Sequence, residues 1–275
     1  ARVMTLRSYD DAKYLLLATR AGLVKKTQLT AYDSSRQAGV IAINFRTDDD
    51  ELIGAELCGP DDDVLLISRK GQAIRFGADD EQLRPMGRVT SGVTGMKFRG
   101  DDELLSMSVI EVGTDEDERF VFTATDGGYA KRTLVSEYRR QGRGGLGIKA
   151  MALSEDRGSL VGGLVVQEAD EVIAIRTSGQ LTRSAVAEVP VKGRSTMGVK
   201  FVNVRGKDAV SIIALNPEHE EPDDPQPGHD EVRGATQGGG SGARGGASDE
   251  DASTDGSTAG TVVSDEASDD AGEHG

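Results

Sequence analysis

The chain is 275 residues long, with a hydrophobic fraction of 36% and a formal net charge of −15. The charge is unevenly distributed: residues 217–275 carry 16 Asp or Glu and two Arg, whereas residues 1–216 carry 31 acidic and 30 basic residues. All three histidines fall in 217–275, and Cys58 is the only cysteine. Residues 1–216 therefore lack the side chains of a Cys/His zinc cluster, a Ser/His/Asp triad or a Cys/His dyad.

The N-terminus and Cys58 indicate the context of the chain. There is no signal-like N-terminus and no apolar run of about 18 residues, so we expect a soluble, intracellular protein. The chain starts at Ala1 inside a predicted strand, so we interpret it as a fragment. Cys58 lies in an apolar-leaning segment, 55–59, where we expect a small buried hydrophobic side chain rather than a reactive thiol.

Four related segments follow one another along the chain. Each predicts a strand of about five residues, a turn that ends in glycine, and a second strand that closes on Lys or Arg. In chain order they are 14–27 (YLLLATRAGLVKKT), 64–75 (VLLISRKGQAIR), 120–133 (FVFTATDGGYAKRT) and 172–183 (VIAIRTSGQLTR). The turn glycines, which we expect in a left-handed backbone conformation, are Gly22, Gly71, Gly128 and Gly179.

The second halves of the units alternate between two versions. Segment 87–93 (GRVTSGV) returns as 193–199 (GRSTMGV), whereas the first and third units carry Tyr32 or Tyr138 before a glycine-containing loop. The units thus repeat in the order A, B, A, B, and they lie near 12–57, 59–110, 117–166 and 168–215.

This pattern predicts the fold class. Apolar segments of strand length, frequent glycine turns and the near absence of helical periodicity predict an all-β fold over residues 1–216. We expect a β-pinwheel or β-propeller-like array of four repeats, in which neighbouring blades bury each other's faces. Residues 217–275 are rich in Gly, Ser, Asp, Glu and Pro with few large apolar side chains, and we predict a disordered acidic tail.

Basic residues recur at equivalent points of the units. The second strands carry Lys25, Lys26, Arg75, Lys131, Arg132 and Arg183, and the central loops carry Arg88, Lys97, Arg194 and Lys200. If the units are arranged radially, bases that recur at the same position of each unit lie on one rim. Such a rim would bind DNA by phosphate contacts and bend it without reading bases. The alternative, that solvated strand ends and loops simply carry such charges, stays open at this point.

Acidic residues form separate runs, which we interpret as solvated connections between strands and units rather than as a metal site. These runs are 48–50, 61–63, 79–80, 101–102 and 115–118.

The most specific local motif is 141–147 (QGRGGLG), which follows two further arginines. Its glycines leave the backbone bare, so that a phosphate approaches both amide N–H groups and guanidinium groups. Neither a dinucleotide fingerprint nor a Walker pattern is present, so the DNA backbone is the better ligand. The residues predicted to contact DNA here are Arg139, Arg140, Gln141, Arg143, Gly144 and Gly145.

The alternating units, the Ala-Thr-x-x-Gly-x-x-Lys-Arg/Lys-Thr segments and the Gly-Arg-x-Thr-x-Gly-Val loops resemble a known family over residues 1–216. That family is the C-terminal domain of the A subunit of bacterial DNA gyrase. In it the domain is a six-bladed β-pinwheel that wraps DNA around a basic rim and gives supercoiling its direction. Four units are present here, and 2–6 (RVMTL) is similar to the end of a preceding blade. The resemblance therefore implies two further blades upstream.

The hallmark box of that family reads Gln, basic, Arg, Gly, Gly, basic, Gly and normally lies in the first blade. Segment 141–147 fits it except at Gly142 and Leu146, which stand where the box has basic residues. It is similar to a secondary, weakened box in the fifth blade of a full domain. The departure puts in doubt whether this segment alone closes a DNA wrap.

The resemblance implies a part within a larger enzyme. It places the DNA-cleaving tyrosine, its metal ligands, ATP and Mg²⁺ outside this chain, in which we predict no catalytic residue, metal or cofactor. Tyr14, Tyr32, Tyr129 and Tyr138 are expected to be core or blade-edge residues. The expected partners are duplex DNA and the other parts of an A2B2 gyrase heterotetramer, which combines A and B subunits. Its expected location is the cytoplasm at the nucleoid, and not a membrane.

Other functions stay open. The nearest alternative is the matching domain of topoisomerase IV, and one from another class is a propeller-like scaffold for protein interactions. An enzyme with its own active site is poorly supported, because no nucleophile and base stand out. The acidic tail either competes with DNA for the basic rim or only adds solubility.

Overall fold

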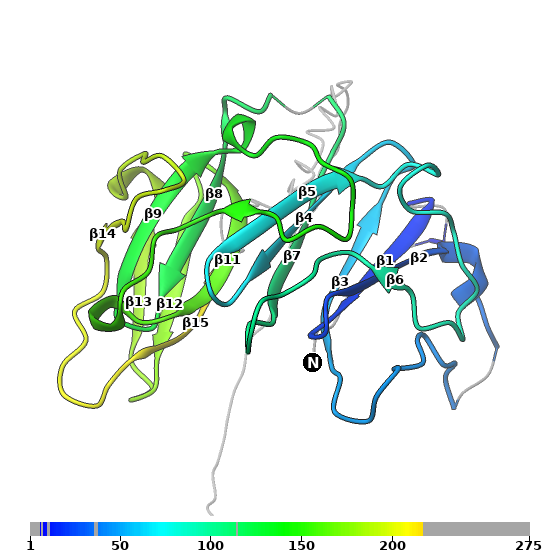
Figure 1. The fold of residues 1–275 in the computed structure, drawn as a ribbon, viewed down its shortest axis with the longest axis horizontal. Helices are drawn as coiled ribbons and strands as arrows, with labels where there is room; N and C mark the ends of the chain where they lie inside the picture. Colours follow the sequence, from blue (N-terminus) through cyan, green and yellow to red (C-terminus); the bar gives the residue numbers. More distant parts are fainter. Residues whose placement is uncertain (1–5, 7, 10–11, 36–37, 114, 217–275) are drawn as a thin grey trace, which may run out of the picture. The chain divides into compact units, whose positions relative to one another are not determined.

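Figure 1 shows the computed structural model, which describes residues 6, 8–9, 12–35, 38–113 and 115–216. All the described residues lie in one compact unit, within Ala1–Asp223. The predicted end of a preceding blade, apart from Leu6, and the predicted disordered tail lie outside the described residues.

The described strands form four antiparallel sheets, which confirms the all-β prediction. The first sheet has the order β3-β1-β2-β6, made of β1 (Tyr14–Thr19), β2 (Leu23–Gln28), β3 (Leu52–Cys58) and β6 (Val93–Thr94). The second has the order β10-β5-β4-β7, made of β4 (Asp63–Ser68), β5 (Gln72–Gly77), β7 (Leu104–Ile110) and β10 (Ile148–Lys149). The third has the order β11-β8-β9-β14, made of β8 (Arg119–Thr125), β9 (Tyr129–Leu134), β11 (Leu160–Gln167) and β14 (Val199–Lys200). The fourth has the order β13-β12-β15, made of β12 (Glu171–Arg176), β13 (Leu181–Ala185) and β15 (Val210–Leu215).

Helical structure in the described residues is limited to short 3₁₀ turns. These are η1 (Leu29–Tyr32), η2 (Val135–Glu137), η3 (Glu155–Arg157) and η4 (Val186–Glu188).

Each unit begins with a tight hairpin whose turn ends in glycine. The four turn glycines have φ angles between 79° and 81°, as predicted, and only glycine adopts this conformation without a steric cost. The third strand pairs on the other side of the hairpin's first strand, and in all four units its register shifts at a bulge near the end of that strand. The units thus share the bulge as well as the hairpin.

A short strand from each following unit completes the sheet before it. Strand β6, from the second unit, pairs with β2, and β10 and β14 pair with β5 and β9 in the same way. The main-chain bonds repeat as well, because Gly22, Gly71 and Gly128 each accept an N–H from the following unit at 2.8–2.9 Å. In the described residues the fourth sheet has three strands. Neighbouring units are therefore joined by exchanged strands.

Consecutive sheets pack face to face through three buried apolar clusters. One cluster joins residues of the first and second sheets, another joins the second and third, and the last joins the third and fourth. The outer strands β3, β7, β11 and β15 also pack against one another in that order. Because the inner strands have a neighbouring sheet on each side, β4 is buried along its whole length instead of alternating between buried and exposed.

Two predictions about single residues are confirmed. Cys58 is a free, buried residue at the end of β3. Tyr14 and Tyr138 are buried in the core, and Tyr129 lies half-buried on β9.

Candidate nucleic-acid interface

Five of the basic residues predicted to form an exposed rim are buried in the structure. Side chains alternate across a strand, but here both faces of the second strand are covered, so basic residues at consecutive positions are all withdrawn from solvent. The relative exposures are 0% for Lys25, Lys26 and Lys131, 6% for Arg132 and 7% for Arg75. These five residues therefore organise the interior, and the exposed basic surface is made of other side chains.

Lys25 and Lys131 lie at the third position after the turn glycine of the first and third units. The Lys25 ammonium donates to the carbonyl oxygens of Ala42 and Arg88, with two longer bonds of 3.4 Å to Gly87 and Thr90. The Lys131 ammonium donates to the carbonyl oxygens of Gly193 at 2.8 Å and Arg194 at 2.7 Å. Burial lowers the pKa of both lysines to about 8.

The fourth position after the turn glycine carries a base paired with an acid in every unit. Lys26 pairs with Asp80 at 3.0 Å, Arg75 with Asp63 at 2.7 Å, Arg132 with Glu168 at 2.8 Å, and Arg183 with Glu171 at 3.5 Å. Arg183 differs from the others because 54% of its side chain is exposed. The reason is that the described residues supply no following unit to cover β13.

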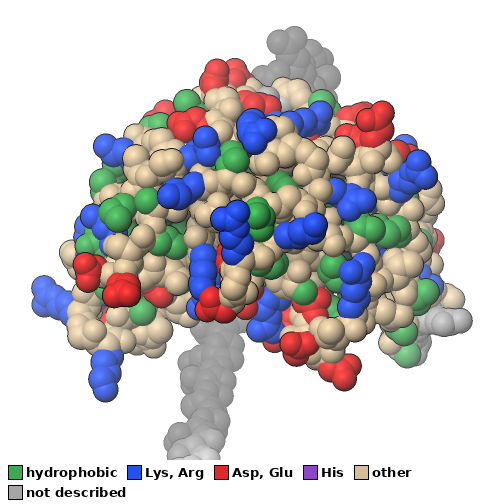
Figure 2. Space-filling model, viewed as in Figure 1, with side chains coloured by type: hydrophobic (Ala, Val, Ile, Leu, Met, Phe, Trp, Pro, Cys, Tyr) green, Lys and Arg blue, Asp and Glu red, His purple; other side chains and the backbone are tan. Residues whose placement is uncertain are grey.

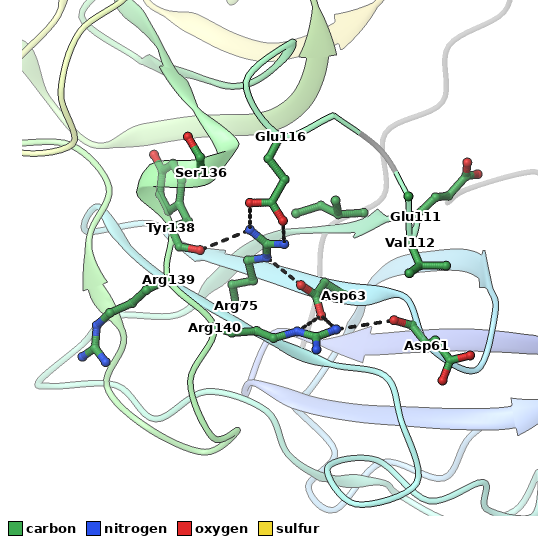
Figure 3. A pocket seen from close by; sticks show the side chains of 12 residues that line it. Asp61, Asp63, Arg75, Glu111, Val112, Glu116, Ser136, Tyr138, Arg139 and Arg140 are labelled. Atoms are coloured by element: carbon green, nitrogen blue, oxygen red, sulfur yellow. Dashed lines mark hydrogen bonds and ion pairs between the residues drawn. The ribbon is translucent and has the colours of Figure 1, made fainter.

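Figure 3 shows the ion-pair network around Arg75 in a pocket of about 410 Å³. The Arg75 guanidinium binds both oxygens of Glu116, at 2.5 and 2.9 Å, and its Nε bonds to Asp63. Arg140, from the third unit, pairs with the other oxygen of Asp63, so this carboxylate joins two units. Hydrogen bonds from Arg75 hold the pKa of Glu116 below its usual range.

The predicted solvated acidic runs are partly buried. Asp63 is 3% exposed and Asp62 is 6% exposed, because the run 61–63 enters strand β4 and meets Arg75 and backbone N–H groups. Asp50 is 8% exposed and accepts the N–H of Ala21 at 2.9 Å. Acids in these runs therefore fix the fold of the chain as well as lining solvent-facing loops.

The loop 141–147 lies along strand β5 of the preceding unit. Its Arg143 guanidinium donates to the carbonyl oxygens of Gln82 and Thr94, and is half-buried as a result. The Gln141 N–H bonds to the carbonyl of Arg75 at 2.8 Å, and the Gly144 N–H bonds to the carbonyl of Gly95 at 2.6 Å. Gly145 lies over Ile74. Arg143 thus ties its loop to the preceding unit, while Arg139 is exposed and extends away from the Arg75 network in Figure 3.

Two loops equivalent to 141–147 carry Arg88 and Arg194. Both arginines are half-buried and each bonds to the carbonyl of the same position in the preceding unit, Arg88 to Ile41 at 3.3 Å and Arg194 to Lys149 at 3.2 Å. Both loops also close the same turn, in which a threonine N–H and hydroxyl bond to the first glycine's carbonyl. The three exchanged loops, 87–92, 141–147 and 193–198, thus each lead into the short strand that joins the preceding sheet, and two of them, 87–92 and 193–198, also share the arginine contact and the threonine turn.

The exposed basic side chains come from these loops and their neighbours. Of the predicted residues, Arg139, Arg140, Arg183, Lys97 and Lys200 are exposed. Sequence reasoning missed further exposed bases among the described residues, which are Lys13, Arg46, Arg69, Lys70, Arg84, Arg99, Lys149, Lys192, Arg205 and Lys207. The sequence offered a signal for two of them, because Lys149 and Lys192 flank the exchanged loops. Figure 2 shows Lys and Arg side chains across the middle of one face, with Asp and Glu mostly nearer its margins.

No helix among the described residues is long and apolar enough to cross a membrane.

The sequence matches the family described as DNA gyrase C-terminal domain, beta-propeller, over residues 13–58, 62–111, 119–167 and 170–216. The A subunit of DNA gyrase from Streptomyces coelicolor is 61% identical over 222 residues, which cover 79% of this chain and 25% of that protein. The A subunit of DNA gyrase from a Nocardioides species is 55% identical over 245 residues, which cover 79% of this chain and 27% of that protein. The chain thus spans about a quarter of the length of these relatives.

Two solved structures share the fold. A DNA gyrase A C-terminal domain is 26% identical with a TM-score of 0.66, covering 77% of this chain and 68% of that chain. The C-terminal domain of a DNA topoisomerase IV is 23% identical with a TM-score of 0.70, covering 77% of this chain and 64% of that chain. At this identity the topoisomerase IV domain shows likeness of fold alone. With four matched segments over most of its length and exchanged-strand sheets, the chain belongs to the DNA gyrase C-terminal domain family.

Proposed function

We propose that residues 12–216 bind duplex DNA without sequence preference, and wrap and bend it, as part of the A subunit of a gyrase. The observation that carries this proposal is the equivalent presentation of three loops, 87–92, 141–147 and 193–198, by successive units. Each loop carries an arginine, and exposed lysines flank them. Regularly spaced positive charges on a series of units suit the regularly spaced phosphates of a bent duplex.

The electrostatic balance supports backbone binding rather than base readout. The described region is nearly neutral overall, so the exposed bases act locally, against acids that are partly withdrawn into ion pairs such as Asp63 with Arg75. Phosphate contacts of this kind carry no sequence information. Wrapping therefore depends on the length of the duplex and on salt, not on its sequence.

The larger assembly belongs to the proposal as well. We propose that the chain acts within an A2B2 enzyme, together with the remainder of its own A subunit. The B subunits complete this enzyme, which would lie in the cytoplasm at the nucleoid. ATP and Mg²⁺ would bind elsewhere in it. Gyrase relatives of 55–61% identity favour gyrase over topoisomerase IV.

The test is binding of the 275-residue chain to linear duplexes of several lengths across a salt series, with the topology of a bound, relaxed circle as a second readout. We expect affinity to grow with duplex length, to weaken steeply with salt, and to be accompanied by writhe of one sign. Binding that is insensitive to duplex length and salt, or absent at low salt, would favour the protein-interaction scaffold instead.

A further inference from the structure

Two buried ammonium groups lie beneath two of the exchanged loops. Lys25 lies under 87–92 and Lys131 under 193–198, and both are 0% exposed. Each ammonium bonds to a carbonyl near the start of its loop, that of Arg88 or Arg194, and Lys25 also bonds to the carbonyl of Ala42 in its own unit. The arrangement therefore occurs twice, in the two units that share the same sequence pattern.

These bonds fix the direction of the loop peptides. In a trans peptide the carbonyl and the following N–H point in opposite directions. Because the carbonyls of Arg88 and Arg194 point inward to an ammonium, the N–H groups of Val89 and Ser195 point outward. Both residues are exposed. Successive outward N–H groups in a turn form a concave site for an anion.

A contact with Glu137 shows that such a peptide N–H binds an anionic oxygen. The peptide between Gly193 and Arg194 has its carbonyl bonded to Lys131, and its N–H donates to the Glu137 carboxylate at 3.2 Å. The equivalent position in the first unit is Ala31, which has no carboxylate to offer. In loop 193–198 the Glu137 carboxylate thus occupies part of the anion site. Loop 87–92 has no such carboxylate at the equivalent position, so its site is open to an anion from outside the chain.

The other sheets lack the buried charge at this position. Ile74 takes the place of Lys25 in the second unit, and the loop that lies over it is 141–147, where a Cβ added at Gly145 would lie 3.4 Å from the Ile74 Cδ1. In the fourth unit the position is Thr182. The lysine is therefore paired with loops of the form Gly-Arg-x-Thr-x-Gly, and isoleucine with the glycine-rich loop.

We propose that loops 87–92 and 193–198 are two discrete phosphate sites for the DNA backbone, each built by a buried lysine that turns the peptide N–H groups of the loop outward. The inference rests on the proposed function, which it deepens. Each site combines the N–H of Val89 or Ser195 with the neighbouring Arg88 or Arg194 guanidinium. Lys25 and Lys131 act as positioning residues and do not touch DNA.

The sites depend on pH because the lysines do. The charged groups that face Lys25 are Arg88 and, through the shared acceptor Ala42, the titratable Tyr32; those that face Lys131 are Glu137 and Arg194. Burial gives each lysine a pKa of about 8. As pH rises through this value, the ammonium loses its charge and one of its three N–H donors, so the inward carbonyl bonds weaken and the phosphate sites weaken with them.

The test uses the 275-residue chain, a short duplex of about one helical turn and the backbone amide signals of Val89 and Ser195 in NMR spectra. Both amides are expected to shift on titration with duplex, Val89 more strongly. Glu137→Gln is expected to increase the shift at Ser195 and leave that at Val89 unchanged. We also measure the slope of the logarithm of the binding constant against the logarithm of salt concentration. Combined Lys25→Met and Lys131→Met substitutions should make this slope shallower by about two, because each lost phosphate contact accounts for ~0.9.

Ile74→Met is the matched control, because it alters packing under the third exchanged loop without removing a charge. It should leave the slope unchanged, and thermal melting checks that every variant folds. Between pH 7 and 9, duplex affinity should fall in the wild type and stay flat in the double Met variant. The inference would be overturned if the chain binds duplex while the Val89 and Ser195 amides do not shift and the folded double variant keeps the wild-type salt slope. If the chain binds no duplex at any salt concentration, the proposed function itself is overturned.

Discussion

A lysine withdrawn from water keeps its charge only where neighbouring oxygens replace its hydration, and Lys25 and Lys131 each have carbonyl oxygens in that role. Burial nevertheless lowers the pKa of both lysines to about 8, below the value of 10.5 for a lysine in water. The unfolded chain therefore binds more protons than the folded chain between these two values. By linkage, these lysines make the free energy of unfolding rise with pH in that window.

We expect Lys25→Met to remove its share of this rise. Over pH 8 to 9.5, wild-type unfolding free energy should increase more steeply than that of the variant, by at most about 1.4 kcal/mol per pH unit for one group. Urea denaturation at a series of pH values measures both slopes. Ile74→Met, at the equivalent position of the second unit, has no titratable group to lose and should keep the wild-type slope. Equal slopes for wild type and Lys25→Met would contradict a lowered pKa of Lys25 in the folded chain.

Asp63 offers a second residue-scale prediction, because it is a buried carboxylate that holds two arginines from different units. Removing one partner of a buried pair leaves an uncompensated charge, at a cost of about 3–5 kcal/mol. We therefore expect Asp63→Asn to lower the unfolding free energy by about 3 kcal/mol. The surface pair of Arg69 and Glu103, at 3.0 Å, supplies the comparison, since Glu103→Gln should cost no more than about 1 kcal/mol. Denaturant titration of the two variants decides, and similar losses would show that the Asp63 network is not a structural centre.

The residue scale is also where sequence reasoning was weakest. Lys25 and Lys131 lie in the middle of the second strands β2 and β9, where the sequence pattern is the same for a solvent-exposed base and for one covered by the next unit. Only the stacking of sheets separates the two cases, and stacking is set by residues about 60 positions away, such as Arg88 and Arg194. Asp63 was hidden for the same reason, inside a run of three identical acids.

At the scale of elements, the hairpins were predictable and the exchanged strands were not. Each hairpin has an apolar first strand, a glycine at the turn and a second strand that carries a basic residue, which together are a strong local signal. Strands β6, β10 and β14 are two residues long, too short for any periodicity, and their partners lie in another unit. The repetition of their loops was visible in the sequence, but the sheet to which each strand adds was not.

Substitutions at the turn glycines test whether the following unit packs against the turn of each hairpin. Gly128 and Gly179 share a φ of about 80°, so alanine is strained at both by ~1–2 kcal/mol. At Gly128 a Cβ would also lie within 3.0 Å of the Val202 carbonyl oxygen of the following unit, whereas at Gly179 no described atom lies within 4 Å. We expect Gly128→Ala to cost about 1–3 kcal/mol more than Gly179→Ala in denaturant titrations. Equal losses would mean that the following unit does not press on the turn.

At the scale of the whole molecule, charge is divided between two regions. Residues 1–216 are nearly neutral, whereas 217–275 carry 16 acidic and two basic residues. A basic surface made of a limited number of exposed side chains is sensitive to a nearby anionic segment, because that segment is a competitor at high effective concentration. This division was readable from the sequence, since it needs only counting, and the sequence leaves two interpretations of it, competition with DNA and added solubility.

We predict that deletion of 217–275 raises the affinity for duplex DNA at moderate salt. The physical reason is that the segment, with a net charge of −14, competes with phosphates for the same exposed bases. The difference should narrow as salt rises, because screening acts on both competitors. Replacing the segment with a neutral Gly/Ser sequence of equal length separates charge from length, and this control should bind like the deletion. If the deletion and the wild type bind equally across the salt series, the segment serves solubility rather than competition, and the exposed loops of residues 12–216 set affinity by themselves.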